Sequence, residues 1–188
     1  VKSGRESLVN SRAYIDTQYV WTYDILFDRL ADGRPFKTLS LLDEFTRECP
    51  AILVATSILS QDVKEVLAAV MAVRGTPAFI RSDNGSEFTA QTVQGWLNEK
   101  QVGPAFIPPG QPWKNGFIES FHDKFRDECL EREWFQSLLE AQTVIETWRV
   151  HYNTQRPHSS LAYQTPVAFA TEFQRQAEAT LIQNGHKN

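Results

Sequence analysis

Residues 20–28, VWTYDILFD, alternate between two kinds of side chain. The odd positions from Trp21 to Phe27 are aromatic or branched apolar, and the even positions from Thr22 to Asp28 carry Thr, Asp, Leu and Asp. A period of two indicates a β-strand, because successive side chains point to opposite faces of a sheet. A strand with one strongly apolar face needs other elements to cover that face. The pattern therefore predicts a fold built on a covered sheet, with Asp24 on the less apolar face of its first strand.

Two more strands and a helix are predicted next. The turn ADGR leads into FKTLSLLDE (36–44), and ECPAILVAT (48–56) forms a third strand. In SQDVKEVLAAVMAVRG (60–75), apolar residues recur at helical spacing from Val63 to Val70. Ser60 is the predicted N-cap residue of this helix, and Gly75 is predicted to end it.

The second half of the chain mixes short strands with helices. PAFIR (77–81) is a predicted strand that ends at the polar loop SDNGSEF, and TAQTVQGWLNEK (89–100) is a helix. VGPAFI (102–107) is a fifth strand, and PPGQPWKNG (108–116) is a loop that leads into another helix. Ser137 and Glu140 form a capping box for a helix that runs to about Asn153. This order is typical of an α/β fold with a mixed sheet covered on both faces.

Composition supports a globular chain. The 188 residues are 41% hydrophobic and 12% aromatic, enough for one domain with its own core. No apolar run approaches the roughly 18 residues of a membrane span, and the first residues, VKSGRESLVNSR, lack the apolar segment of a signal peptide. Cys49 and Cys129 have no CxxC partner or suitably spaced His, so neither a disulfide scaffold nor a zinc site is expected.

Three acidic residues lie close to the predicted strand ends. Asp24 is on the first strand, Asp83 follows the fourth, and Glu119 is on the helix after the fifth. Ligands of open α/β sheets bind beyond the carboxyl ends of strands, so the three side chains can converge. Clustered carboxylates repel one another and raise one another's pKa values. Such a cluster therefore suits a cation site better than a purely structural role.

The helix that carries Glu119 is amphipathic. At about 100° per residue, its apolar stripe consists of Ile118, Phe121, Phe125 and Cys129. Glu119 lies on the flank of this stripe with His122 and Arg126. Taken alone, Glu119 is most simply a solvated charge at a helix boundary. Its assignment to a site depends on the other two acids.

Four segments together resemble a known family: WTYD around Asp24, IRSDNGSEF around Asp83, PPGQPWKNGFIESFHDKFRDE around Glu119, and YNTQRPHSSLAYQTP (152–166). They resemble the integrase-core transposases of bacterial insertion sequences, in particular the second-frame protein of the insertion-sequence-three family, a relative of retroviral integrases. The 35 residues between Asp83 and Glu119 (84–118) fit this family. Two positions depart from it: Lys114 replaces the usual acid before Asn, and Ala162 replaces a Gly, which predicts strain in a turn.

The resemblance implies a ribonuclease H-like fold, a five-stranded mixed sheet with helices on both faces. It implies that Asp24, Asp83 and Glu119 form the catalytic and metal-binding triad, with Mg²⁺ or Mn²⁺, two ions, as cofactor. Such ions bind carboxylate and phosphate oxygens and serve phosphoryl transfer. The expected reaction is DNA cleavage and strand transfer at insertion-sequence ends. The expected division is a lead-in segment (1–18), a catalytic core (19–173) and a flexible tail (174–188).

The net charge of -4 disfavours a strongly basic DNA-binding surface. Local DNA contacts are expected from Lys114, Asn115, His122, Lys124, Arg126 and Arg156. Asn115 could instead cap the helix, which is the favoured role, and His122 could be purely structural. In the resembled family, end recognition belongs to a helix-turn-helix region, here expected upstream of Val1 or on a first-frame partner protein. A homo-oligomer that acts on duplex DNA in the bacterial cytoplasm is expected.

Other acids near the strands have simpler structural roles. Asp28 shares a strand face with Asp24 and could replace it as a ligand, but its place near the strand end favours a turn or surface role. Asp43 and Glu44 end the second strand and are expected to be structural, with Arg47 as a partner.

Two other functions fit parts of the sequence. One is a cellular nuclease of ribonuclease H type, which the Glu119 loop and the YNTQRPH segment disfavour. The other is a non-catalytic DNA-binding or assembly remnant of a mobile element, which the three intact acids disfavour. The YNTQRPHSSLAYQTP segment is expected to clasp the end of the chain onto the domain through Tyr152, Leu161 and Tyr163.

Overall fold

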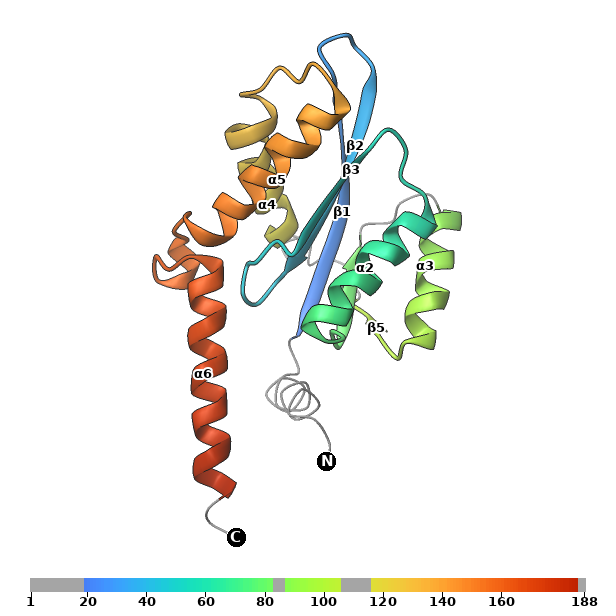
Figure 1. Cartoon of the computed structure of the whole chain (residues 1–188). Helices are drawn as coiled ribbons and strands as arrows, with labels where there is room; N and C mark the ends of the chain where they lie inside the picture. The colour runs from blue at the N-terminus through green and yellow to red at the C-terminus, as the bar shows by residue number, and fades with distance from the viewer. Residues whose placement is uncertain (1–18, 83–86, 106–115, 186–188) are drawn as a thin grey trace.

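The structure is a computed structural model that describes residues 19–82, 87–105 and 116–185 (Figure 1). Its elements follow in this order: β1 (Val20–Arg29), β2 (Pro35–Asp43), β3 (Ala51–Ala55), α2 (Ser60–Arg74), β4 (Phe79–Ser82), α3 (Glu87–Glu99), β5 (Gly103–Pro104), α4 (Gly116–Phe125), the π-helix η2 (Arg126–Leu130), α5 (Leu138–Thr154), the 3₁₀ turn η3 (Ser159–Leu161) and α6 (Pro166–Gly185). Within this part of the chain, no helix is long and apolar enough to cross a membrane.

The five strands form one mixed sheet in the order β3-β2-β1-β4-β5. β1 pairs antiparallel with β2 and parallel with β4, so β1 lies at the centre of the sheet. In this register Asp24 lies opposite Ser40 of β2, and its neighbour Tyr23 lies opposite Ser82 of β4. The five-stranded mixed sheet predicted from the sequence is confirmed.

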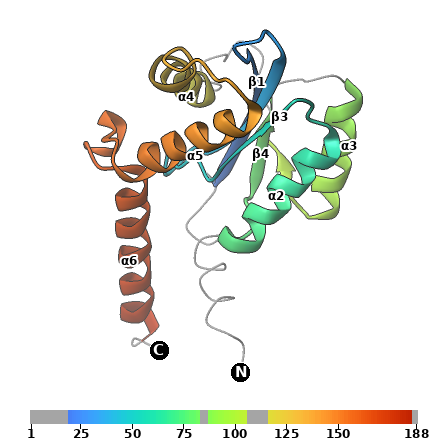
Figure 2. The ribbon, with the colours of Figure 1, turned by 45° about the horizontal axis from the view of Figure 1, so that its top comes forward.

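Helices cover both faces of the sheet, α2 and α3 on one side and α4 and α5 on the other (Figures 1 and 2). The first side buries Trp21, Leu39 and Leu41 against apolar residues of α2 and α3 such as Leu67 and Val93. The second side buries Leu26, Phe36 and Leu42 against Ile118, Phe121, Phe125, Ile145 and Trp148. The alternation of β1 thus sends Trp21 to one layer and Leu26 to the other, because consecutive side chains of a strand face opposite ways.

Aromatic side chains join α4 to α5. The ring of Phe125 lies 4.8 Å from that of Trp148, and the ring of Phe121 lies 5.1 Å from that of Tyr152 in an edge-to-face arrangement. Aromatic pairs at such distances contribute about 0.5–1.5 kcal/mol beyond the burial of their area. This contact fixes α4, and with it the turn that carries Glu119, against the rest of the domain.

Two helix starts show how well capping can be predicted. Ser137 is the N-cap of α5, as predicted, and its hydroxyl accepts a hydrogen bond from the Glu140 N–H at 3.2 Å. Ser60 is not the N-cap of α2, so that prediction is wrong: the N-cap is Leu59, and its N–H donates to the Asp62 carboxylate at 2.6 Å. The side chain of Asp62, the third residue of the helix, thus satisfies the N–H of the N-cap residue.

The segment after α5 folds back as a compact turn. Leu161 is buried and the ring of Tyr152 lies 4.8 Å from that of His158, as expected for a clasp. Tyr163 is 76% exposed, so its predicted role as an anchor is wrong. Ala162 adopts φ 52°, a left-handed conformation that strains a residue with a Cβ atom, in keeping with the strain predicted for this turn.

The last helix, α6, leaves the body of the domain (Figures 1 and 2). Its first turns pack on the sheet end through Phe45, whose ring lies 5.5 Å from Phe169 and 4.7 Å from Phe173. The helix continues through position 174, where the sequence analysis placed the boundary between core and tail. The division of the chain into segments stays a prediction.

Candidate active site

Asp24 lies in the middle of β1, on the sheet face that α4 and α5 cover. Its side chain is 33% exposed, and its Oδ1 atom accepts a hydrogen bond from the Ile25 N–H at 2.7 Å. Because Tyr23 and Ile25 pack in the opposite layer, alternation directs Asp24 toward α4. A carboxylate that is neither fully buried nor fully solvated can bind an external cation.

Helix α4 reaches Asp24 through His122. The Nδ1 atom of His122 lies 3.5 Å from the Oδ2 atom of Asp24, and the imidazole is 7% exposed. Glu119 is exposed and lies in the first turn of α4, three residues before His122. Residues three apart are neighbours on one side of a helix. The predicted acid Glu119 therefore lies one helical turn from the contact between α4 and Asp24.

The third predicted acid, Asp83, lies outside the described residues. The chain reaches it directly from Ser82, the last residue of β4, which is paired with Tyr23 next to Asp24. Among the residues that the structure describes, no group of three His, Cys, Asp or Glu side chains is placed to hold a metal ion. The three-acid site, which includes Asp83, stays a prediction.

His122 is neutral at physiological pH. Burial, aided by the positive charge of Arg126 and opposed by Asp123, lowers its pKa from 6.5 to about 4. The 3.5 Å contact with Asp24 would be an ion pair only if the ring were charged. We assign His122 as a neutral imidazole that directs its Nδ1–H at the Asp24 carboxylate, since burial disfavours the charged form of the ring. A neutral His122 does not neutralise the charge of the Asp24 carboxylate.

The floor beneath Asp24 is polar. Thr22, Thr38 and Ser40 are at most 1% exposed, on the same sheet face as Asp24. Their hydroxyls have no hydrogen-bond partner within the described part of the chain. Buried hydroxyls are normally paired with protein or ordered water. This floor and the two oxygen-donor carboxylates of Asp24 and Glu119 fit a hard, hydrated divalent cation such as Mg²⁺.

Two other acids near the site have structural partners. Glu44 pairs with Arg81, whose Nε lies 3.0 Å from Glu44 Oε1, and both side chains are less than 10% exposed. Burial raises the pKa of Glu44, and the charge of Arg81 partly offsets this rise. Asp43 accepts hydrogen bonds from the N–H groups of Phe45 and Thr46, each at 3.0 Å, and so closes a turn. The structural role expected for Asp43 and Glu44 fits these contacts.

Arg47 and Asp28 also contact their near neighbours. Arg47 donates to the Glu44 carbonyl rather than to its carboxylate, and its guanidinium lies 3.8 Å from the centre of the Phe117 ring. Phe117 is the second residue of α4, so this cation–π contact holds the start of the Glu119 helix. The Asp28 carboxylate accepts a hydrogen bond from the Arg29 N–H at 2.7 Å, in keeping with the favoured surface role.

The predicted DNA-binding residues have different surroundings. Arg126 is exposed, one turn beyond His122. Lys124 donates to the carbonyl and hydroxyl of Ser120, at 2.8 and 2.6 Å. Arg156 is held by Glu128 through three hydrogen bonds of 2.6 to 3.0 Å. Lys114 and Asn115 lie outside the described residues, and contact with DNA stays a prediction for all six.

Sequence reasoning missed two contacts of this site. The contact between His122 and Asp24 could have been suggested by the spacing of His122 from Glu119, but burial of the ring depends on tertiary packing. Arg47 stacks on Phe117 from a left-handed backbone conformation, with φ 61°. No pattern in DEFTREC predicts that conformation.

A mixed sheet in this strand order, with a central acid facing a helix that carries a second acid, defines the ribonuclease H-like class of folds. The family described as "Integrase core domain" matches residues 17–112 and again residues 100–166. The chain belongs to this family, in the branch found in bacterial insertion elements.

Individual relatives agree with this membership. The chain is 42% identical over 172 residues to an insertion element IS476 protein of Xanthomonas euvesicatoria, covering 92% of this chain and 49% of that protein. It is 41% identical over 160 residues to an insertion element IS407 protein of Burkholderia multivorans, covering 85% and 58%. The chain thus spans about half the length of these relatives.

A solved structure shares the fold. The catalytic core domain of HTLV-2 integrase, in complex with magnesium and in a dimeric form, superposes with a TM-score of 0.52 at 15% sequence identity. The match covers 79% of this chain and 92% of that domain. At this identity the likeness concerns the fold alone.

Proposed function

We propose that the chain is the catalytic core of a transposase that cleaves and joins DNA strands at insertion-sequence ends, with Mg²⁺ or Mn²⁺ as cofactor. The observation that carries the proposal is the contact of α4 with Asp24, which brings the turn of Glu119 to the central strand. Family membership and the magnesium complex of the HTLV-2 integrase domain support the chemistry.

In this proposal Asp24, Asp83 and Glu119 supply the oxygen ligands. His122 directs its Nδ1–H at one oxygen of Asp24 and so orients the carboxylate. Two bound divalent ions would polarise the phosphate and activate the nucleophile. The exposed Arg126, the first residue of η2 and one turn beyond His122, is placed to bind a phosphate of the DNA backbone.

Two displacements at phosphorus make up the reaction. In the first, a water oxygen bonds to a phosphorus at the element end, the bond from that phosphorus to the 3′-oxygen breaks, and the leaving oxygen gains a proton. In the second, the freed 3′-hydroxyl loses its proton, its oxygen bonds to a phosphorus of the target, and the target's own 3′-oxygen leaves. No covalent bond to the protein is needed.

We propose that recognition of the element ends depends on a helix-turn-helix element, which belongs either to a fused segment or to a first-frame partner protein. A net charge of -4 supports this division, because the 19 Lys and Arg residues are outnumbered by 23 Asp and Glu residues and leave no excess of cations for neutralising phosphates. We also propose that the core acts as a homo-oligomer, in the bacterial cytoplasm.

The test is a strand-cleavage and strand-joining assay on duplexes that carry the terminal repeats of the parent element, with Mg²⁺ or Mn²⁺. We expect product from the parent chain, and at least a hundredfold less from Asp24→Asn, Asp83→Asn and Glu119→Gln. Asp28→Asn is the matched control, because Asp28 shares the strand and sheet face of Asp24 and its carboxylate bonds to its neighbour's backbone. Near-normal joining by any triad variant would refute the assignment of that residue. Metal-independent cleavage would refute the mechanism.

A further inference from the structure

The outer face of α5 carries no charge along its centre. At about 100° per residue, five exposed residues fall within an arc of about 80° on the side of this helix away from the core. These residues, which we call the α5 stripe, are Leu139, Thr143, Thr147, Val150 and Thr154. Leu139 is 72% and Val150 46% exposed, and Figure 2 shows α5 on the outside of the sheet. A row of apolar and uncharged side chains along one exposed helix face is typical of an interaction surface.

Each threonine of the α5 stripe has a satisfied hydroxyl. Thr143 donates to the Leu139 carbonyl at 2.9 Å, Thr147 donates to the Thr143 carbonyl at 2.8 Å, and Thr154 donates to the Val150 carbonyl at 2.7 Å. A hydroxyl that bonds to its own helix keeps that bond when a second surface covers it. The stripe can therefore lose its water without leaving an unpaired donor.

The charged side chains beside the stripe are committed elsewhere. The Glu146 carboxylate accepts two hydrogen bonds from Arg149, at 2.6 and 2.7 Å, and Arg149 also donates to two backbone carbonyls just before β3. Glu140 accepts a hydrogen bond from the Gln136 N–H at 2.6 Å. α5 has no lysine and no second arginine. The stripe therefore offers no free lysine or arginine to a phosphate backbone, which argues against DNA as its occupant.

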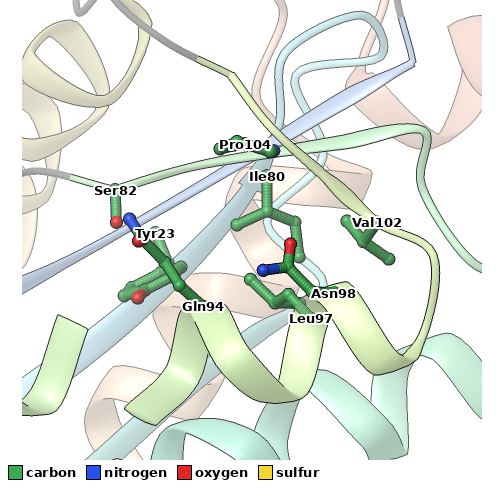
Figure 3. A pocket seen from close by; sticks show the side chains of 8 residues that line it. All are labelled: Tyr23, Ile80, Ser82, Gln94, Leu97, Asn98, Val102 and Pro104. Carbon is green, nitrogen blue, oxygen red and sulfur yellow. The ribbon is translucent and has the colours of Figure 1, made fainter. Parts of the chain in front are cut away.

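The helix layer on the other side of the sheet is less suited to a dry contact. A pocket of about 230 Å³ lies there, and Figure 3 shows Gln94 and Asn98 of α3 lining it. Both residues are exposed. A partner that covered these carboxamides would have to supply hydrogen bonds in place of water. The threonines of the α5 stripe make no such demand.

The side chains of the α5 stripe alternate in size in a way that fits a second copy of the same helix. A two-fold axis between Glu146 and Thr147 lies midway between positions 139 and 154, and equally midway between positions 143 and 150. Two antiparallel copies of α5 related by this axis would place Leu139 against Thr154 of the second copy, and Val150 against Thr143 of the second copy. Each bulky side chain then meets a smaller one, as in the packing of ridges into grooves.

We propose that the α5 stripe is a contact between two copies of this chain, with α5 packed antiparallel on α5 about a two-fold axis. The inference deepens the proposed homo-oligomer and rests on that part of the proposed function. A two-fold contact presents one patch to itself, so a charge at its centre would face a like charge. The stripe avoids this repulsion. A single helix pair falls at the low end of interface sizes, below about 1,200 Å², so the dimer is weak and forms at micromolar concentrations or above.

The first test is sedimentation equilibrium of the whole chain over a range of concentrations. Val150→Glu places an acid in the stripe, and we expect the dimer dissociation constant to rise by at least about tenfold, because the acid meets an uncharged face and its own copy close by. Val73→Glu is the matched control: Val73 is 85% exposed on α2, and the same substitution there should leave the dissociation constant at the parent value. Both variants should melt like the parent, since both positions are exposed.

A charge swap tests the antiparallel register. In Thr143→Lys/Val150→Glu each introduced acid faces an introduced lysine of the second copy, twice in the symmetric dimer. We expect the dissociation constant to return to within about threefold of the parent value, because the opposite charges now meet. Failure of this variant to recover association would show that the stripe does not pack on itself in this register, and would overturn the proposal.

Three further outcomes would overturn it as well: a parent chain that stays monomeric at every concentration, a Val150→Glu variant that associates like the parent, or a Val73→Glu variant that loses association equally. The strand-cleavage assay separates this inference from the proposed function. If the parent cleaves and joins DNA while any of these outcomes holds, only the α5 contact is wrong. If the parent associates through α5 but shows no metal-dependent cleavage, the contact stands and the proposed function fails.

Discussion

The guanidinium of Arg81 and the carboxylate of Glu44 form a buried ion pair, 3.0 Å from Nε to Oε1, on the sheet face that carries Asp24. Arg81 is two residues before Asp83, and its β1 partner is Thr22, two residues before Asp24. The pair therefore anchors β4 to the end of β2, two residues before Asp83 in the sequence.

Arg81→Met should destabilise the fold by about 3–5 kcal/mol, because it leaves the Glu44 carboxylate buried without its partner. The double variant Arg81→Met/Glu44→Leu should recover most of that loss, since it removes both charges. Urea unfolding of both variants measures the difference. Arg34→Met is the control: it breaks an exposed pair with Asp32 and should cost less than about 1 kcal/mol. Equal losses in the single and double variants would contradict the pairing.

Asp83→Asn should leave the fold intact and abolish stabilisation by metal. In the proposed triad it removes one of three mutually repelling carboxylates, so the melting temperature without metal should stay level or rise. Addition of Mg²⁺ or Mn²⁺ should raise the melting temperature of the parent only. Thermal unfolding with and without metal measures both effects, and metal stabilisation of Asp83→Asn equal to that of the parent would exclude Asp83 as a ligand.

Tyr152 should matter for stability far more than Tyr163, although both belong to the YNTQRPHSSLAYQTP segment. Tyr152 is 3% exposed and packs on Phe121, so Tyr152→Ala should cost about 3–5 kcal/mol. Tyr163 is 76% exposed, and Tyr163→Ala should change the unfolding free energy by less than about 0.5 kcal/mol. Truncation after Thr147 should also lower the melting temperature, because it removes Trp148 and Tyr152 from the core. Equal costs for the two tyrosines would argue against the clasp.

His158 should make stability depend on pH below neutrality. Burial, aided by the charges of Arg156 and Lys124, lowers its pKa to about 4 from 6.5. Between these values the unfolded chain binds more protons than the folded chain, so stability is complete above about pH 6.5 and falls as the pH drops toward 4. The contribution at stake is on the order of 2–3 kcal/mol. Urea unfolding at several pH values should show a shallower dependence for His158→Phe, and parallel profiles would contradict this role.

Binding of duplex DNA by this core should be weak, salt-dependent and without preference for the element ends. Each phosphate contact contributes a slope of about -0.9 in log affinity against log salt. Arg126→Ala should therefore lower the slope by about one unit. Arg175→Ala, which removes a cation paired with Glu172 on α6, should leave the slope unchanged. A preference for terminal-repeat over scrambled duplex at physiological salt would show that end recognition is built into these residues.

The sheet could be predicted from the sequence because the alternation of side chains in β1 is a local pattern. The alternation from Trp21 to Phe27 predicts a strand in a covered sheet. In the structure, a hydrophobic core covers each face of this sheet. The stripe of Ile118, Phe121, Phe125 and Cys129 was equally readable, and all four are buried. Periodicity carries this information because it is a property of neighbouring residues.

The three acids of the candidate site stay a prediction, and the contacts that support Asp24 and the start of α4 were not predicted from the sequence. Asp24 was singled out by its place on an alternating strand and Glu119 by the 35 residues that separate it from Asp83, whereas the burial of His122 depends on how α4 packs against β1. The pairing of Tyr23 with Ser82 depends on the register between two strands that are separated by β2, β3 and α2. Contacts of that kind follow from tertiary structure, which local patterns do not encode.

The π-helix η2 changes which side chains of this segment face the core. A π-turn adds about one residue to a helical turn, so it changes the angular phase of everything that follows. In a regular α-helix Leu130 would lie about 140° around the axis from Phe125, whereas the i→i+5 bonds of a π-turn bring residues five apart to the same side, and both are buried in the core. Residues 126–130 therefore behave as an α-helix with one residue inserted, and Leu130 reaches the core because the helix absorbs that residue.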